Sequence, residues 1–347
     1  MKAIKRGSVW SSLLSLFLVL AVSRGLGVSA SVDDLIAAAK KEGVIEMLAP
    51  STLTPKGAQA LAEAFNQRYG LNIKFSYHPS SNMTGDVAKV VGRAASGVSP
   101  EWDVMIVTDS HHGSLWLKKQ HVTYDYKKVG VDPRLIHYDS GAVSFANQII
   151  LPAYNKKILP ANDVPKKWED LLDPKWKGKI GVPHSVHHFA RLAAGPWGEE
   201  KTTQFVKRLA AREPFIGTPP QMYTRLQLGE IHLVSNIQDS FIHEAERKGA
   251  PLAQAHGIEP VPSPAYHVGV LKGAPHPNVG HLLAVFMTTP EAQKLWEKYS
   301  GHTSAFVPGT EVYRYAQTHQ MVYMTQDQAE MVDRLTNVYV KIMGFGR

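Results

Sequence analysis

The alternation of strand-like and helix-like segments constrains the fold of this chain most strongly. Residues 44–48 and 103–107 are short apolar runs with the length of buried strands, and residues 71–77 form another extended segment. Residues 56–69 and 83–95 carry apolar side chains at helical spacing, and the first of these helices is predicted to end at Gly70. Such alternation is typical of an α/β fold.

A second α/β unit follows in the middle of the chain. Strands are expected at 180–182 and 231–235, and helices at about 202–211, 221–228 and 241–248. Two units of this size suit a chain of 347 residues, which is long enough to bury more than one apolar core.

Two long extended segments connect the predicted units. The first covers 142–154 and carries Asn147 and Gln148 in its middle, and the second covers 265–271. Strands that cross between two lobes can act as a hinge, since a few torsions near the crossing absorb the closure. We therefore predict one lobe from 31–148 and 265–305, and a second from 149–264 and 306–347.

The first 30 residues have the features of an export signal. Lys2, Lys5 and Arg6 precede an apolar run at 13–22, and Val28-Ser29-Ala30 offers small residues for cleavage. An apolar run of this length is too short to cross a bilayer, which takes roughly 20 residues. We expect cleavage near Ala30 and a periplasmic mature protein.

Composition narrows the classes of partner. The chain has no cysteine, so it has neither disulfides nor the processing cysteine of a lipid-anchored protein. Removal of the signal with Lys2, Lys5, Arg6 and Arg24 lowers the formal charge from +8 to +4. The remaining charges are interspersed, without the basic blocks of a nucleic-acid-binding protein. We expect a monomer that does not bind nucleic acid.

Five polar loops are the candidate binding residues. Each follows a predicted strand and precedes a helix, where ligands of open α/β sheets bind and helix N-termini present free N–H groups. The same residue types also cap helices without any ligand. The loops contribute Ser51 and Thr52; Ser80, Ser81 and Asn82; Thr108, Asp109, Ser110 and His111; His184, Ser185 and His187; and Asn236, Gln238 and Asp239.

Histidine and tyrosine add to this set. His187 lies next to His188 and close to His184, and these residues could be solvated or capping groups, ligand contacts or metal ligands. No HExxH motif is present, so we predict no metal site and no cofactor. Tyr266 and His267 stand at the second crossing, where packing and a role in the cleft are both possible.

Three motifs resemble one protein family. They are Tyr154-Asn155-Lys156-Lys157, the segment Trp168 to Gly181 (WEDLLDPKWKGKIG), and Lys272-Gly273-Ala274-Pro275-His276-Pro277 followed by Pro290-Glu291-Ala292-Gln293. In this order they resemble the periplasmic solute-binding proteins of ABC importers, particularly the ferric-iron-binding type. The resemblance implies a two-lobed type II periplasmic-binding-protein fold with two crossover strands at a hinge, a small-molecule or ion ligand, and an inner-membrane ABC permease as partner.

The chain departs from the ferric branch of that family at one place. That branch usually has adjacent tyrosines after the strand that here ends at Ser235-Asn236, whereas this chain has Gln238-Asp239-Ser240-Phe241. We expect a small oxygen-rich anion as the ligand, such as a phosphorylated or carboxylated solute, because hydroxyls, imidazoles and helix N-termini suit its oxygens. Ferric iron or an iron chelate is the alternative ligand.

The functional prediction is a receptor that is not an enzyme. It captures a solute between its lobes and delivers it to a permease. A secreted hydrolase with a metal or histidine site is the alternative of another class, but the sequence has no G-x-S-x-G motif. A sensor that binds the same ligand and docks a receptor kinase is a further alternative.

Overall fold

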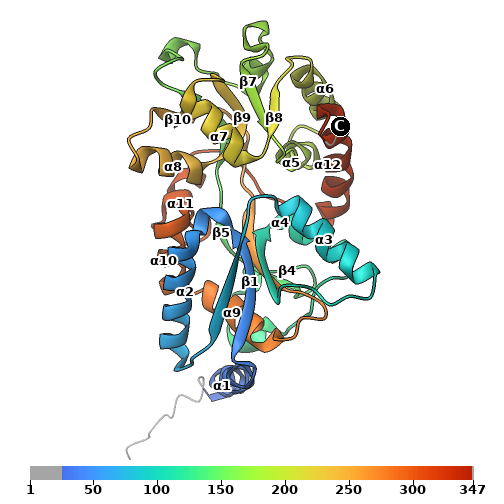
Figure 1. The fold of residues 1–347 in the computed structure, drawn as a ribbon, viewed down its shortest axis with the longest axis vertical. Coiled ribbons are helices and arrows are strands. Elements are labelled where there is room, and N and C mark those ends of the chain that lie inside the picture. The colour runs from blue at the N-terminus through green and yellow to red at the C-terminus, as the bar shows by residue number, and fades with distance from the viewer. Residues whose placement is uncertain (1–25, 346–347) are drawn as a thin grey trace, which may run out of the picture.

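Two large sheets and one two-stranded sheet organise residues 26–345, the part of the chain that the computed structural model describes (Figure 1). The predicted signal, residues 1–30, lies largely outside this range. Helix α1, Leu26–Glu42, runs through the predicted cleavage point. Within the described range, no helix combines the length and apolar composition that a membrane crossing needs.

The first sheet has six strands in the order β2-β1-β3-β12-β5-β4. The three strands β1, β2 and β3 are parallel, and β12 runs antiparallel to β3 and β5. The bounds are β1 Val44–Pro50, β2 Lys74–Ser80, β3 Val104–Thr108, β4 Ile136–His137, β5 Ala142–Asn147 and β12 Ala265–Val270.

Helices cover both faces of this sheet. Neighbouring residues of β3 belong to different cores, since Ile106 packs with α2 and α9 while Met105 packs with α3 and α4. This follows from the two-residue period of a strand. The helices are α2 Thr54–Tyr69, α3 Met83–Ala95, α4 Asp109–Leu117, α9 Pro277–Met287 and α10 Pro290–Ser300.

The second sheet has five strands in the order β10-β6-β9-β7-β8. Here β7 is parallel to β8 and β9, and β6 is antiparallel to β9. Its strands are β6 Ile150–Asn155, β7 Ile180–Pro183, β8 Phe215–Gly217, β9 Leu233–Gln238 and β10 Leu252–Gln254. Its helices are α5 His187–Ala194, α6 Glu199–Ala210, α7 Pro219–Leu228, α8 Asp239–Arg247 and α12 Ala329–Met343.

The motif at 168–181 is a packing element of this second lobe. Trp168–Leu172 forms a short 3-10 helix, and the buried Trp168 indole donates a hydrogen bond to the Pro260 carbonyl at 2.9 Å. Trp176 likewise donates to the Asp170 carbonyl at 2.8 Å. The segment then enters β7 directly, as the sequence predicts.

Three segments cross between the sheets, one more than the sequence predicts. The first joins β5 to β6 through Gln148 and Ile149, and the second joins β11, Val261–Pro262, to β12. The third follows α10 and leads to α11, Glu311–Ala316, and to β13, Met321–Val322, which pairs with β11. It contacts the first crossing where the Ala305 amide donates to the Asn147 side chain at 3.0 Å.

Helix α12 was not predicted from the sequence. It packs against α5 and α6 of the second lobe and also against α4 of the first. Figure 1 shows it standing beside the second sheet with one end next to α3 and α4. The C-terminal tail therefore contacts both lobes at their junction.

Candidate functional site

Strand ends from both sheets meet at a cleft between the lobes. The parallel strands β1, β2 and β3 end at Pro50, Ser80 and Thr108, and β7 and β9 end at Pro183 and Gln238. The cleft encloses about 70 Å³. Its lining is Pro50, Ser51, Thr52, Ser80, Ser81, Asn82, Met83, Thr84, Thr108, His111, Gln148, His184, Ser185, His187, His188, Pro219, Pro220, Gln238, Phe241 and Tyr266.

Six helices begin at this cleft. They are α2, α3 and α4 of the first lobe, and α5, α7 and α8 of the second. The first N–H groups of a helix have no partner within it, and the helix dipole places partial positive charge at that end. Helix α7 begins with Pro219 and Pro220, which have no N–H, so it contributes its dipole only. Both lobes therefore present the same electrostatic sign to the cleft, which favours an anion.

Tyr266 reaches the cleft because its strand, β12, runs antiparallel to the neighbouring strands β3 and β5. Tyr266 pairs with Thr108, so the beginning of β12 lies at the edge where β3 ends. The Tyr266 side chain is fully buried, and its hydroxyl has no hydrogen-bond partner in the protein. Burial raises the pKa of Tyr266 above its ordinary value, so the hydroxyl stays protonated and able to donate.

The cleft histidines form a contact across the lobes. The His111 and His187 rings lie 4.9 Å apart between centroids, and those of His187 and His188 lie 4.2 Å apart. Burial, together with the nearby Arg191 guanidinium, lowers the pKa of His111 to about 3. Burial, the neighbouring imidazoles and Arg191 hold the pKa values of His187 and His188 well below the ordinary range. All three imidazoles are neutral at pH 7.

Several predicted residues are held in place by internal hydrogen bonds. The Thr108 hydroxyl lies 2.8 Å from His111 Nδ1, and the Thr84 hydroxyl lies 3.3 Å from His111 Nε2. The Asn82 side chain accepts from the Gly85 amide at 3.2 Å and caps α3, and the Ser80 hydroxyl donates to the Asp86 carboxylate. Capping and cleft lining are thus compatible roles for one residue.

The structure brings twelve of the seventeen predicted residues to the cleft. These are Ser51, Thr52, Ser80, Ser81, Asn82, Thr108, His111, His184, Ser185, His187, Gln238 and Tyr266. All five predicted loops contribute to this set, and Tyr266 comes from the second crossing. Loops that the sequence picked out at the ends of strands thus come together in the structure at one edge of each sheet.

Asp109 does not line the cleft, because its carboxylate is paired. Arg191 of the second lobe donates to both carboxylate oxygens, one at 3.1 Å, and the Ala265 amide donates at 3.2 Å. The side chains of Asp109 and Arg191 are 3 % and 0 % exposed. The pair joins α4 to α5 and is a structural contact between the lobes.

Four other predicted residues also point elsewhere. Ser110 lines a neighbouring cavity, and the Asn236 side chain donates to the Ser185 carbonyl at 3.1 Å. Asp239 lies 2.9 Å from His302 Nδ1 of the third crossing. His267 is buried in the first lobe, where its ring lies 4.8 Å from that of His137.

Sequence reasoning missed part of the lining. The missed residues are Pro50, Met83, Thr84, Gln148, Pro219, Pro220 and Phe241, whereas His188, which the sequence offered as a possible ligand contact, also lines the cleft. Gln148 carried a signal, because a polar side chain in the middle of an extended crossing is unusual for a buried segment. Pro219 and Pro220 follow a short strand, β8, that the sequence pattern does not show.

Four buried polar atoms of the lining have no hydrogen-bond partner in the protein. They are Thr52 Oγ1, His187 Nδ1, His188 Nδ1 and the Tyr266 hydroxyl. Leaving such groups unpaired costs about 1–3 kcal/mol each. Because these four atoms lie in the cleft, water or a ligand bound there can complete their hydrogen bonds.

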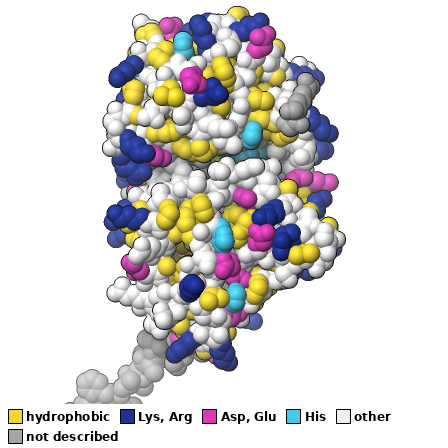
Figure 2. Space-filling view, in the orientation of Figure 1, with side chains coloured by type: hydrophobic (Ala, Val, Ile, Leu, Met, Phe, Trp, Pro, Cys, Tyr) yellow, Lys and Arg dark blue, Asp and Glu magenta, His cyan; other side chains and the backbone are white. Residues whose placement is uncertain are grey.

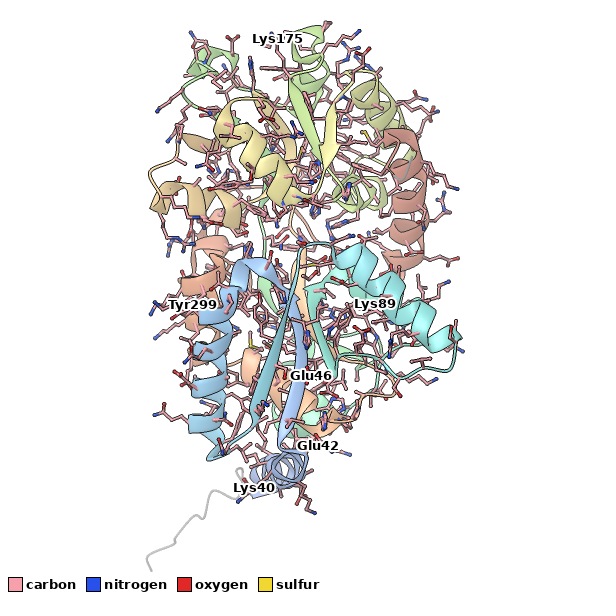
Figure 3. The ribbon with its side chains drawn as sticks, viewed as in Figure 1. Lys40, Glu42, Glu46, Lys89, Lys175 and Tyr299 are labelled. Atoms are coloured by element: carbon pink, nitrogen blue, oxygen red, sulfur yellow. The ribbon has the colours of Figure 1, made fainter. Side chains whose placement is uncertain are left out.

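Within the part of the chain that the structure describes, the residues that line the cleft include no lysine, arginine, aspartate or glutamate. On the face shown in Figure 2, uncharged atoms border the middle of the junction, with histidine visible there. The charged side chains labelled in Figure 3 include Lys175 at one end of the molecule and Lys40 and Glu42 at the other. Among residues 26–345, no three His, Cys, Asp or Glu side chains are grouped so that they could hold a metal ion.

The family model for bacterial extracellular solute-binding proteins matches residues 60–318. This chain belongs to that family. The match covers most of both sheets and the cleft loops from Ser80 onward, and the protein is a substrate-binding component of an ABC transporter. A search of curated proteins found no match.

Solved structures of this class share the fold of this solute-binding protein. AfuA from Actinobacillus pleuropneumoniae with fructose-6-phosphate is 19 % identical with a TM-score of 0.72, covering 88 % of this chain and 99 % of its own. Iron-bound HitA from Pseudomonas aeruginosa is 16 % identical with a TM-score of 0.70, covering 86 % of this chain and 99 % of its own. MotA from Agrobacterium tumefaciens B6 with glucopine is 16 % identical with a TM-score of 0.68, covering 86 % of this chain and 99 % of its own. The two-lobed type II periplasmic-binding-protein fold predicted from the sequence is confirmed.

Acidification is expected to destabilise this solute-binding protein. Burial lowers the pKa of His121 and of His281 to about 4, against about 6.5 in the unfolded chain. Below pH 6.5 the unfolded chain therefore binds protons that the folded protein does not, and each such histidine costs about 1 kcal/mol of stability at pH 5.5. His243 acts oppositely, since its bond with Glu311 raises its pKa to about 9. The urea concentration at the midpoint of unfolding should be clearly lower at pH 5.5 than at pH 7.5. Equal midpoints would contradict the claim that burial keeps these histidines neutral in the folded protein.

Proposed function

We propose that the cleft binds a small oxygen-rich anion, such as a phosphorylated or carboxylated organic solute. The observation that supports this most is the convergence of six helix N-termini on buried donors that lack partners. A phosphate or carboxylate group accepts several hydrogen bonds at once, which matches hydroxyl, imidazole and backbone N–H donors. The absence of acidic side chains from the lining removes the main source of repulsion.

The lining suits an oxyanion better than ferric iron. A hard trivalent cation needs anionic oxygen ligands, and the lining contains one tyrosine, Tyr266, and no carboxylate. Burial raises the pKa of that tyrosine, which disfavours the phenolate. The six positive helix ends would also repel a bare cation.

We further propose how the protein works. It is a monomeric, non-enzymatic receptor of the periplasm, with lobes at 31–148 plus 265–305 and at 149–264 plus 306–347. Ligand contacts from both lobes favour the closed form, because only that form satisfies donors on both sides at once. An inner-membrane ABC permease then receives the solute from the closed form. The crossings at Gln148 and between β11 and β12 are the hinge.

Native mass spectrometry of protein from its own host's periplasm tests the ligand class. We expect a bound organic anion at one copy per chain and no stoichiometric iron. The same anion added back to stripped protein should raise the melting temperature, since ligand at 100 times Kd adds about 2.7 kcal/mol of stability. Stoichiometric iron, or a cationic or uncharged ligand, would contradict the proposal.

A further inference from the structure

A second cavity, here called the side cavity, adjoins the cleft. It has a volume of about 200 Å³ and lies between α3 and α4 of the first lobe and α5 and α12 of the second. Thr84, His111 and His187 line both the cleft and the side cavity. These three residues therefore stand at the junction of the two spaces.

Apolar atoms make up most of the side-cavity surface, although only four of its lining residues are aliphatic. Val87, Ala88 and Val91 of α3 face Val332 and Thr336 of α12. Asp333 also lines it, but its carboxylate accepts a hydrogen bond from the Ser114 hydroxyl, which links α12 to α4. Lys118 and Asn337 line the cavity from exposed positions, and so border it on the solvent side.

The two spaces differ in what they can hold. The cleft, at about 70 Å³, has room for a compact headgroup, whereas apolar cavities of about 150 Å³ bind molecules as large as benzene. His187 is 7 % exposed and lines both spaces, and its Nδ1 has no partner in the protein. A ligand that extends from one space into the other would pass Thr84, His111 and His187, which line both.

We propose that the ligand carries a short aliphatic chain, which extends from an oxyanion headgroup in the cleft into the side cavity. This inference rests on the proposed oxyanion site and names the ligand class more closely. The chain contacts the valine and alanine side chains of α3 and α12. Specificity therefore depends on the C-terminal helix as well as on the cleft loops.

A homologous ligand series tests the proposal. The probes are inorganic phosphate with methyl-, propyl- and hexylphosphonate, and in parallel the unbranched carboxylates from formate to heptanoate, titrated calorimetrically. We expect Kd to fall about two- to fourfold for each added CH₂ until the side cavity is filled. Affinity that does not depend on chain length, with the headgroup alone bound as tightly, would overturn this inference and leave the oxyanion site standing.

A cavity-filling variant gives the second readout. Ala88→Leu places a larger side chain in the side cavity from an exposed helical position, where leucine preserves helix propensity. It should weaken the longest ligand that binds at least tenfold and change the headgroup alone less than twofold. Ala94→Leu is the matched control, since Ala94 is exposed on the same helix but does not line the cavity.

The outcomes separate the two proposals. Equal loss of affinity for short and long ligands in Ala88→Leu, or no loss for either, would overturn the side-cavity assignment. Failure of every phosphonate and carboxylate to bind, phosphate included, would overturn the oxyanion site and this inference together.

Discussion

Replacing Arg191 with methionine is expected to lower the free energy of unfolding by about 3–5 kcal/mol. The substitution removes the guanidinium that donates to both Asp109 oxygens and leaves a carboxylate that is 3 % exposed without its counter-charge. Methionine has a similar length and fills most of the space, so lost packing contributes little. Urea unfolding of the Arg191→Met variant measures the loss.

An exposed ion pair supplies the control for this prediction. Arg334 donates to both oxygens of Glu199, at 2.9 and 2.7 Å, with side chains about half exposed. Arg334→Met should lower the stability far less than Arg191→Met does, because water solvates the remaining carboxylate. Similar losses for the two variants would show that burial does not govern the Asp109–Arg191 pair.

A double variant separates the two contributions to the loss. Adding Asp109→Asn to Arg191→Met removes the buried charge and should restore part of the stability. No restoration would show that the cost arises from the packing of α5 rather than from the unpaired carboxylate.

Tyr266→Phe is expected to weaken ligand binding roughly 10- to 150-fold while leaving the ligand-free protein as stable or slightly more stable. A hydrogen bond to a charged group contributes about 1.5–3 kcal/mol, and the Tyr266 hydroxyl has no other partner. The ring keeps its contacts with Trp296 and Phe145, at centroid distances of 5.3 and 6.4 Å. Calorimetric titration with the ligand that co-purifies, and urea unfolding without it, measure the two effects.

Tyr126→Phe is the matched control with the opposite pattern. Tyr126 is equally buried, but its hydroxyl lies 2.9 Å from His281 Nδ1 and away from the cleft. This variant should lose about 1–3 kcal/mol of stability and keep the wild-type affinity. A Tyr266→Phe protein that loses stability but binds normally would place the Tyr266 hydroxyl in the core rather than in the site.

The Arg191→Met and Tyr266→Phe variants together distinguish two kinds of buried polar group at the lobe junction. Asp109 and Arg191 satisfy each other across the lobes, so their role is complete without a ligand. Thr52, His187, His188 and Tyr266 are left with unpaired atoms in the same region. Unpaired groups lower the stability of the ligand-free protein, and such a cost is typical of binding sites.

The sequence by itself determined the fold class and the edge of the sheets at which the site lies. Both follow from local patterns: the continuous apolar run of β3 and the helical spacing of α2 are properties of neighbouring residues. The loops at Ser80–Asn82 and His184–His187 were found because strands of a parallel sheet end at a common edge. The family resemblance came from equally local motifs, such as the Trp168 segment.

Only the tertiary structure decided which side chains of those loops face the cleft. Thr108 lines it and the adjacent Asp109 does not, because Arg191, 82 residues later, pairs with Asp109 from the other lobe. Gln148 and the side-cavity walls on α12 depend in the same way on residues distant in the chain. Local periodicity sets where a strand or helix lies, but the partner of each polar side chain is set by packing between elements, which a single sequence does not specify.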